Sequence, residues 1–191
     1  MESEKLSVEK SFEIITQVIT QARNRFEENG FIYLFWGLLI SLASIGQFIL
    51  LQKEYYTINW YPYLLMPIGA VFSGYYFAKK KEKPQRNMIG RIVSWVYVIL
   101  SINMMVLGFM FYPTLKENLI PIILILLSVG IFISAIAIKS RLLLFSGILI
   151  NLSAFACFSI EPIYRPLLMG IVSIIAVMIP GIILMIQHKK R

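Results

Sequence analysis

Six stretches without a single charged residue or histidine take up most of this chain of 191 residues. A helix needs roughly 20 apolar residues to cross the hydrocarbon core of a bilayer, and each stretch has about that length. Only 15% of all residues are charged, against about 25% in ordinary soluble domains. The pattern predicts an all-α membrane protein with six transmembrane helices, at residues 30–51, 60–78, 92–112, 120–138, 142–160 and 167–187.

The connections predict three helical hairpins. Only Lys139, Ser140 and Arg141 separate the fourth stretch from the fifth, so these two helices should be antiparallel neighbours. No long polar segment follows residue 30. We therefore expect a polar arm at residues 1–29, one transmembrane domain at residues 30–187 and a basic tail at residues 188–191.

The distribution of lysine and arginine predicts the orientation. The net charge is +8, which on a soluble protein would suggest nucleic acid. Here 15 of the 18 basic residues lie before the first stretch, after the last one, or in the second and fourth connections. The positive-inside rule places these segments, and both termini, in the cytoplasm. The expected partner is the lipid bilayer, and no nucleic acid is expected.

The arm carries an amphipathic pattern. Apolar residues recur at spacings of 4, 3, 4, 3 and 4, which predicts a helix over residues 7–29 with one apolar stripe. The segment is too polar to span, so it should lie on the cytoplasmic side. The stripe consists of Val8, Phe12, Ile15, Ile19, Ala22 and Phe26.

The charges of the arm suggest where the stripe docks. Surface helices that bind anionic lipid are usually rich in lysine and arginine, but this arm has six glutamates against four basic residues. The basic connection after the second stretch faces the same compartment. We expect the arm to dock there, in its own or a neighbouring subunit; the alternative is an interfacial helix leading into the first span. The candidate contact residues are Phe12, Ile15, Ile19, Phe26, Lys79, Lys80, Lys81, Lys83 and Arg86.

Three amides, Gln47, Asn103 and Asn151, lie inside the apolar stretches. An amide in hydrocarbon is costly unless it is hydrogen-bonded, so these side chains should face the bundle interior or another subunit. The favoured interpretation is hydrogen bonding between helices. The alternative is a polar path or substrate pocket.

Small residues and prolines suggest close packing and bends. Gly37 and Ser41 lie four residues apart, a spacing that lets helices approach closely. Pro67 and Pro180 should bend the second and sixth helices, because proline removes a backbone donor. Residues 34–42 also align with residues 144–152 at six of nine positions, which leaves open a duplicated hairpin.

Enzyme chemistry finds little support in the sequence. The chain has no aspartate, and its one histidine, His188, lies in the C-terminal tail. Metal-ligand clusters and glycine-rich phosphate loops are absent, so no catalytic residue, metal or cofactor is expected. Cys157, the one cysteine, lies within an apolar stretch, where packing is its usual role.

The junction at residues 26–37, which reads FEENGFIYLFWG, carries a resemblance. It resembles small uncharacterised multi-span inner-membrane proteins of Bacteroidetes-type bacteria. That resemblance implies a bacterial inner-membrane location and carries over no functional residue. The hairpin plan is more loosely similar to the six-span HdeD-type proteins.

These observations favour a non-enzymatic membrane protein that works by association, as a homo-oligomer or with a membrane or cytoplasmic protein partner. The alternative is a small transporter or an oligomeric channel for a neutral or lipidic substrate.

Overall fold

The computed structural model describes residues 8–28, 30–79 and 88–190 of the chain. Within these ranges every regular element is helical and none is a strand, which confirms the predicted all-α class. The helices are α1 (Val8–Glu28), α2 (Gly30–Gln52), α3 (Leu65–Lys79), α4 (Met88–Phe109), α5 (Tyr112–Leu115), α6 (Leu119–Ala137), α7 (Arg141–Ser159), α8 (Arg165–Ser173) and α9 (Ile179–Lys189).

Five helical segments of the described chain have the length and composition of membrane spans, as expected of a multi-pass membrane protein. They are Gly30–Gln52, Arg91–Phe109, Tyr112–Ala137, Arg141–Ser159 and Pro162–Gln187. The remaining predicted span, residues 60–78, forms a 3-10 turn (Tyr61–Leu64) followed by the 15 residues of α3. Taken alone, α3 is shorter than the roughly 20 residues that a span needs. Five of the six predicted spans are therefore supported by length and composition.

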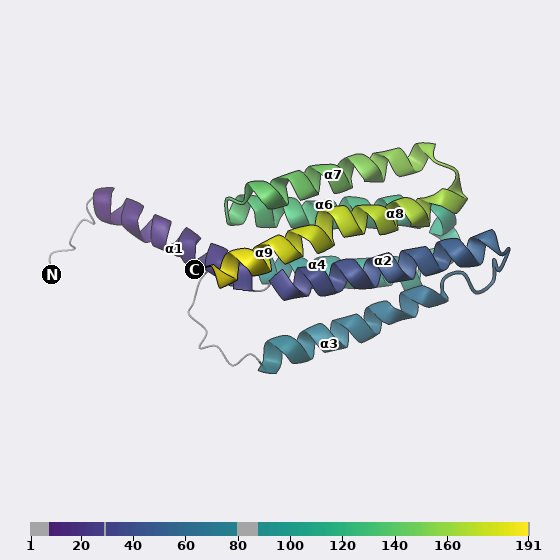
Figure 1. Cartoon of the computed structure of the whole chain (residues 1–191), viewed down its shortest axis with the longest axis horizontal. Helices are drawn as coiled ribbons and strands as arrows, with labels where there is room; N and C mark the ends of the chain where they lie inside the picture. The colour runs from purple at the N-terminus through teal and green to yellow at the C-terminus, as the bar shows by residue number, and fades with distance from the viewer. Residues whose placement is uncertain (1–7, 29, 80–87, 191) are drawn as a thin grey trace.

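The first and last spans pack closely along their length. A Cβ atom added to Gly37 of α2 would lie 2.6 Å from the backbone nitrogen of Met178, so the two backbones are in contact there. Ser41 Oγ donates to the carbonyl of Gly170, and Ser173 Oγ donates to the carbonyl of Gly37. The Gly37–Ser41 spacing thus marks a close helix contact, as predicted. Figure 1 shows α2 running beside α8 and α9.

The helices α6 and α7 lie side by side. The Ser140 hydroxyl accepts a hydrogen bond from the backbone N–H of Leu143 and caps α7. Further along, Gly147 lies against the ring of Phe132, and Asn151 Nδ2 donates to Ser128 Oγ. The side chains of the core come mostly from α6, α7 and α8–α9, and they include Leu124, Ile131, Leu143, Ile150 and Met169.

Pro67 and Pro180, the two prolines with a predicted bend, affect their helices differently. Before Pro180, residues Ile174–Met178 form a π turn in which the Ile179 N–H bonds the carbonyl of Ile174. Proline lacks the N–H that would bond the carbonyl four residues back, and its ring clashes with that carbonyl, so the helix is irregular at this point. Pro67 lies in the first turn of α3, where no such bond is lost, so it marks a helix start rather than the expected bend.

The helix α1 joins the bundle at one end, where it contacts α9. It spans Val8–Glu28, close to the predicted residues 7–29. Figure 1 shows α1 projecting beyond the end of the bundle, beside the end of α9. On the opposite side of the bundle from α6 and α7, α3 lies along α2.

Candidate functional site

The apolar stripe of α1 is largely uncovered in its N-terminal half. Phe12 is 67% exposed and Ile15 is 54% exposed, while Ile19 is half-buried. The neighbouring Ile14 is 48% exposed and widens the stripe. The side chain of Phe26 lies outside the described residues. The described chain therefore leaves the start of the stripe without a packing partner.

The basic connection can be placed only at its edge. Lys79 ends α3, and its Nζ lies 5.9 Å from the centre of the Tyr75 ring, within reach of a cation–π interaction. Lys80, Lys81, Lys83 and Arg86 lie outside the described residues. The expected contact between arm and basic connection therefore stays a prediction.

The three candidate amides lie in three separate settings. Asn151 of α7 bonds Ser128 of α6, which is the predicted helix-to-helix hydrogen bond. Gln47 of α2 is buried, and its Nε2 donates to Asn59 Oδ1 at 3.4 Å. Asn103 of α4 is exposed and donates to the carbonyl of Ile99 in its own helix. Gln47 and Asn151 therefore bond within the bundle, whereas the exposed Asn103 leaves another subunit as its expected setting.

A polar cluster surrounds Gln47. Asn59 accepts from Tyr112 Oη at 3.2 Å and donates to the carbonyl of Tyr56 at 2.7 Å. Gln47 Oε1 is buried and has no hydrogen-bond partner within the described chain. The cluster ties the end of α2 to the start of α5 through the intervening loop. Asn59 was not predicted, because the sequence places it in a connection rather than in an apolar stretch.

Three hydrogen-bonded hydroxyl groups join α2, α4 and α6. They lie near the start of α2, away from the cluster around Gln47. Tyr33 Oη lies 3.1 Å from Tyr97 Oη, which lies 3.0 Å from Ser134 Oγ. Ser134 Oγ also donates to the carbonyl of Gly130. Such hydrogen bonds between membrane helices contribute about 0.6 kcal/mol each on average. The network fixes how these three helices face one another.

Arg165 is a buried cation, although the sequence places it in a connection between two apolar stretches. It is 8% exposed, and its Nε donates to the carbonyl of Ile160 at 3.1 Å. Its Nη1 donates to the carbonyl of Glu117 at 2.8 Å and to Asn118 Oδ1 at 3.3 Å. All three acceptors are neutral. Arg165 therefore joins two connections that are far apart in the sequence.

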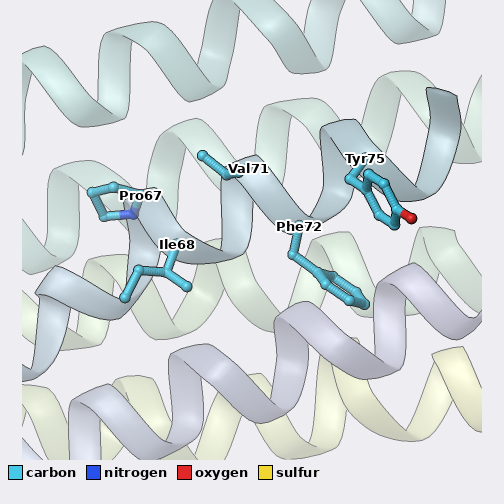
Figure 2. Close-up of a pocket in the computed structure, with 5 residues that line it drawn as sticks. All are labelled: Pro67, Ile68, Val71, Phe72 and Tyr75. Atoms are coloured by element: carbon cyan, nitrogen blue, oxygen red, sulfur yellow. The ribbon is translucent and has the colours of Figure 1, made fainter.

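The outer face of α3 carries a shallow apolar hollow. Figure 2 shows its lining residues along one side of this helix: Pro67, Ile68, Val71, Phe72 and Tyr75. Phe72 also reaches α2, where its ring lies 4.7 Å from the Phe35 ring, centre to centre, and Ser73 of α3 accepts a hydrogen bond from Trp36 Nε1 of α2. None of the three candidate amides lines this hollow. An apolar surface of this kind is what a lipid-facing helix presents.

Comparison with family models, with curated proteins and with solved structures finds no match for the chain.

Proposed function

We propose that the protein is a six-span bacterial inner-membrane protein that works by association, with copies of itself or with a partner membrane or cytoplasmic protein, and without catalysis of its own. The exposed stripe of α1 supports this proposal most. Phe12 and Ile15 are more than half exposed on a helix that projects beyond the end of the bundle. Exposed apolar patches with a polar rim are typical of interaction surfaces.

The length of the α3 segment supports a sixth span. The 3-10 turn Tyr61–Leu64 adds about 8 Å and the 15 residues of α3 add about 22 Å. Together they reach the roughly 30 Å of a hydrocarbon core. With six spans, the 15-to-3 distribution of basic residues places both termini in the cytoplasm.

Charge complementarity favours a protein surface over lipid as the partner of the stripe. Residues 1–29 hold six glutamates and four basic residues, whereas residues 79–91 hold six basic residues and one glutamate. Opposite potentials steer two surfaces together and fix their register. An acidic surplus is repelled by anionic lipid. The arm of one chain therefore suits the basic connection of its own chain or of a neighbour.

Replacing Phe12, Ile15 and Ile19 together by serine tests this proposal. A buried large apolar side chain contributes about 1.5–3 kcal/mol, so the triple variant should weaken association at least tenfold. The measurement is the mass and the protein content of the complex purified in mild detergent, compared with the wild type.

The matched control replaces Thr16, Gln17 and Thr20 by serine. These three residues lie on the polar side of the same helix, and all are exposed. The control should assemble like the wild type. Unchanged assembly and partner recovery in the apolar triple variant would contradict the proposal.

A further inference from the structure

The helix α4 is the least covered of the five candidate spans. Within the described chain only 6% of its span is buried, against 28–50% in the other four. Its inner side packs through the buried Val93 and through Tyr97, which reaches Tyr33 and Ser134. Leu100 packs against Gly130 of α6, and most of the other side chains of the span are exposed.

More than one exposed side of α4 has heptad spacing, and one of them contains Asn103, the one amide of this helix. The residues of that side recur at spacings of 4, 3, 4, 3 and 4, the alternation that brings two supercoiled helices together along one seam. We call this set the α4 seam: Ile92, Val96, Ile99, Asn103 and Val106 of α4, with Met110 directly after it. Four of its apolar members are exposed, by 49% (Ile92), 55% (Ile99), 37% (Val106) and 71% (Met110). Val96 is half-buried.

Asn103 is the one polar member of the α4 seam, and it is exposed in the middle of a span. One of its amide N–H groups bonds the carbonyl of Ile99 at 2.8 Å. The second N–H and the carbonyl oxygen have no partner within the described chain. Lipid tails offer neither donor nor acceptor, so an amide in hydrocarbon is costly unless another side chain meets it.

A second copy of the chain would bring its own Asn103 amide to the same depth in the membrane. All copies enter the membrane in the same orientation, so a two-fold axis along the membrane normal sets two α4 helices parallel, with each residue opposite its counterpart. An amide carries both donors and an acceptor, and is therefore complementary to itself. A single asparagine at such a core position specifies the register of paired helices.

We propose that two copies of this chain pair along the α4 seam, with Asn103 hydrogen-bonded to the partner's Asn103. This inference deepens the proposed function, because it names a second copy as one partner and gives the surface that it binds. It rests on α4, whereas the proposed function rests mainly on α1. Different experiments therefore test the pairing along α4 and the proposed function.

Disulfide cross-linking of the full chain in its native membrane tests the pairing. Cys157 is the one native cysteine and is fully buried, so Cys157→Ala gives a background without thiols. Single cysteines are then placed on the seam at Ile92, Ile99 and Val106, which leaves the Asn103 amide in place. With a mild oxidant, these three variants should form a covalent dimer several-fold more than positions off the seam.

The controls share the exposure and the depth of the seam positions. Val98 and Met105 are exposed on another side of α4, and Leu152 is exposed on α7 at a comparable distance from the start of its span. Equal cross-linking on and off the seam, or a maximum at Val98 and Met105, would overturn the pairing. A further outcome is that cross-linking at the seam fails while the α1 triple variant still loses assembly. That result would support association of the protein and contradict pairing along the α4 seam.

A second measurement tests the amide itself. Asn103→Val keeps the seam apolar and removes the hydrogen bond, so dimerisation in lipid should weaken about 3- to 30-fold. Since Asn103 bonds only its own helix in the described chain, the variant should fold normally, which an unchanged temperature of unfolding in detergent would show. Dimerisation unchanged or stronger in Asn103→Val would overturn the role of the amide.

Discussion

At the scale of single residues, Arg165 shows how this bundle closes one of its ends. Its guanidinium group is nearly fully buried and bonds two backbone carbonyls and one amide oxygen. Arginine suits this position because its planar group presents several donors in fixed directions. The side chain holds the connection before α6 against the start of α8.

Replacing Arg165 by alanine should therefore destabilise the bundle. Hydrogen bonds made by a charged group contribute about 1.5–3 kcal/mol, and the carbonyls of Glu117 and Ile160 would lose their partner. The free energy of unfolding in mixed detergent micelles should fall by about that amount. Arg165→Lys should recover only part of it, because lysine cannot reach three acceptors at once.

Lys53 offers the control for that experiment. It is an exposed residue in another connection on the same side of the bundle, and Lys53→Ala should leave the free energy of unfolding nearly unchanged. Equal stability of the Arg165→Ala and Lys53→Ala variants would show that the buried arginine makes no net contribution.

At the scale of the elements, the contact between α2 and the α8–α9 segment depends on residues without large side chains. Gly30 and Gly181 lie against each other's helix backbone, as Gly37 does against Met178. The π turn Ile174–Met178 lies where Gly37 makes its close approach, and Pro180 follows it at once. The π turn and the close contact with α2 therefore lie in the same short stretch of the chain.

Gly37→Ala should weaken this contact. The new methyl group would lie 2.6 Å from a backbone nitrogen, which cannot move as a side chain can. Overpacking of this kind costs about 1–3 kcal/mol, so the temperature of unfolding in detergent should fall.

Gly74 on α3 gives the matched control for Gly37. A Cβ atom there has nothing within 4 Å, so Gly74→Ala should be neutral or slightly stabilising, since alanine favours a helix by up to about 1 kcal/mol over glycine. If both variants unfold at the same temperature, the close contact of α2 with the last span does not limit stability.

Much of the element scale could be predicted from sequence, because a charge-free run and its flanks depend on local composition. The amphipathic helix of α1, five span-length helices and the α6–α7 neighbours follow from such runs. The split of residues 60–78 into a 3-10 turn and a short helix does not, since the 3-10 turn Tyr61–Leu64 and Pro67 all lie inside an apolar stretch. The burial of Arg165 was also missed, because it depends on partners 47 and 48 residues away.

At the scale of the whole molecule, the first and last spans meet at the centre of the bundle, with α3 on one side and α6–α7 on the other (Figure 1). Sequence periodicity could not predict this, because apolar faces that look alike can pack in many orders. The surfaces that this arrangement leaves uncovered in the described chain include the stripe of α1 and the α4 seam. Both carry exposed apolar side chains next to polar groups that lipid alone does not match. These groups are the glutamates of the arm and the amide of Asn103.

The most direct test of association is the mass of the wild-type protein purified in mild detergent, with the detergent contribution subtracted. The single chain has a mass of 22.0 kDa. We predict a defined complex of at least twice that mass, containing a second copy and any partner that binds the arm. A stable particle with the mass of one chain, free of other proteins over the concentration range studied, would contradict this account.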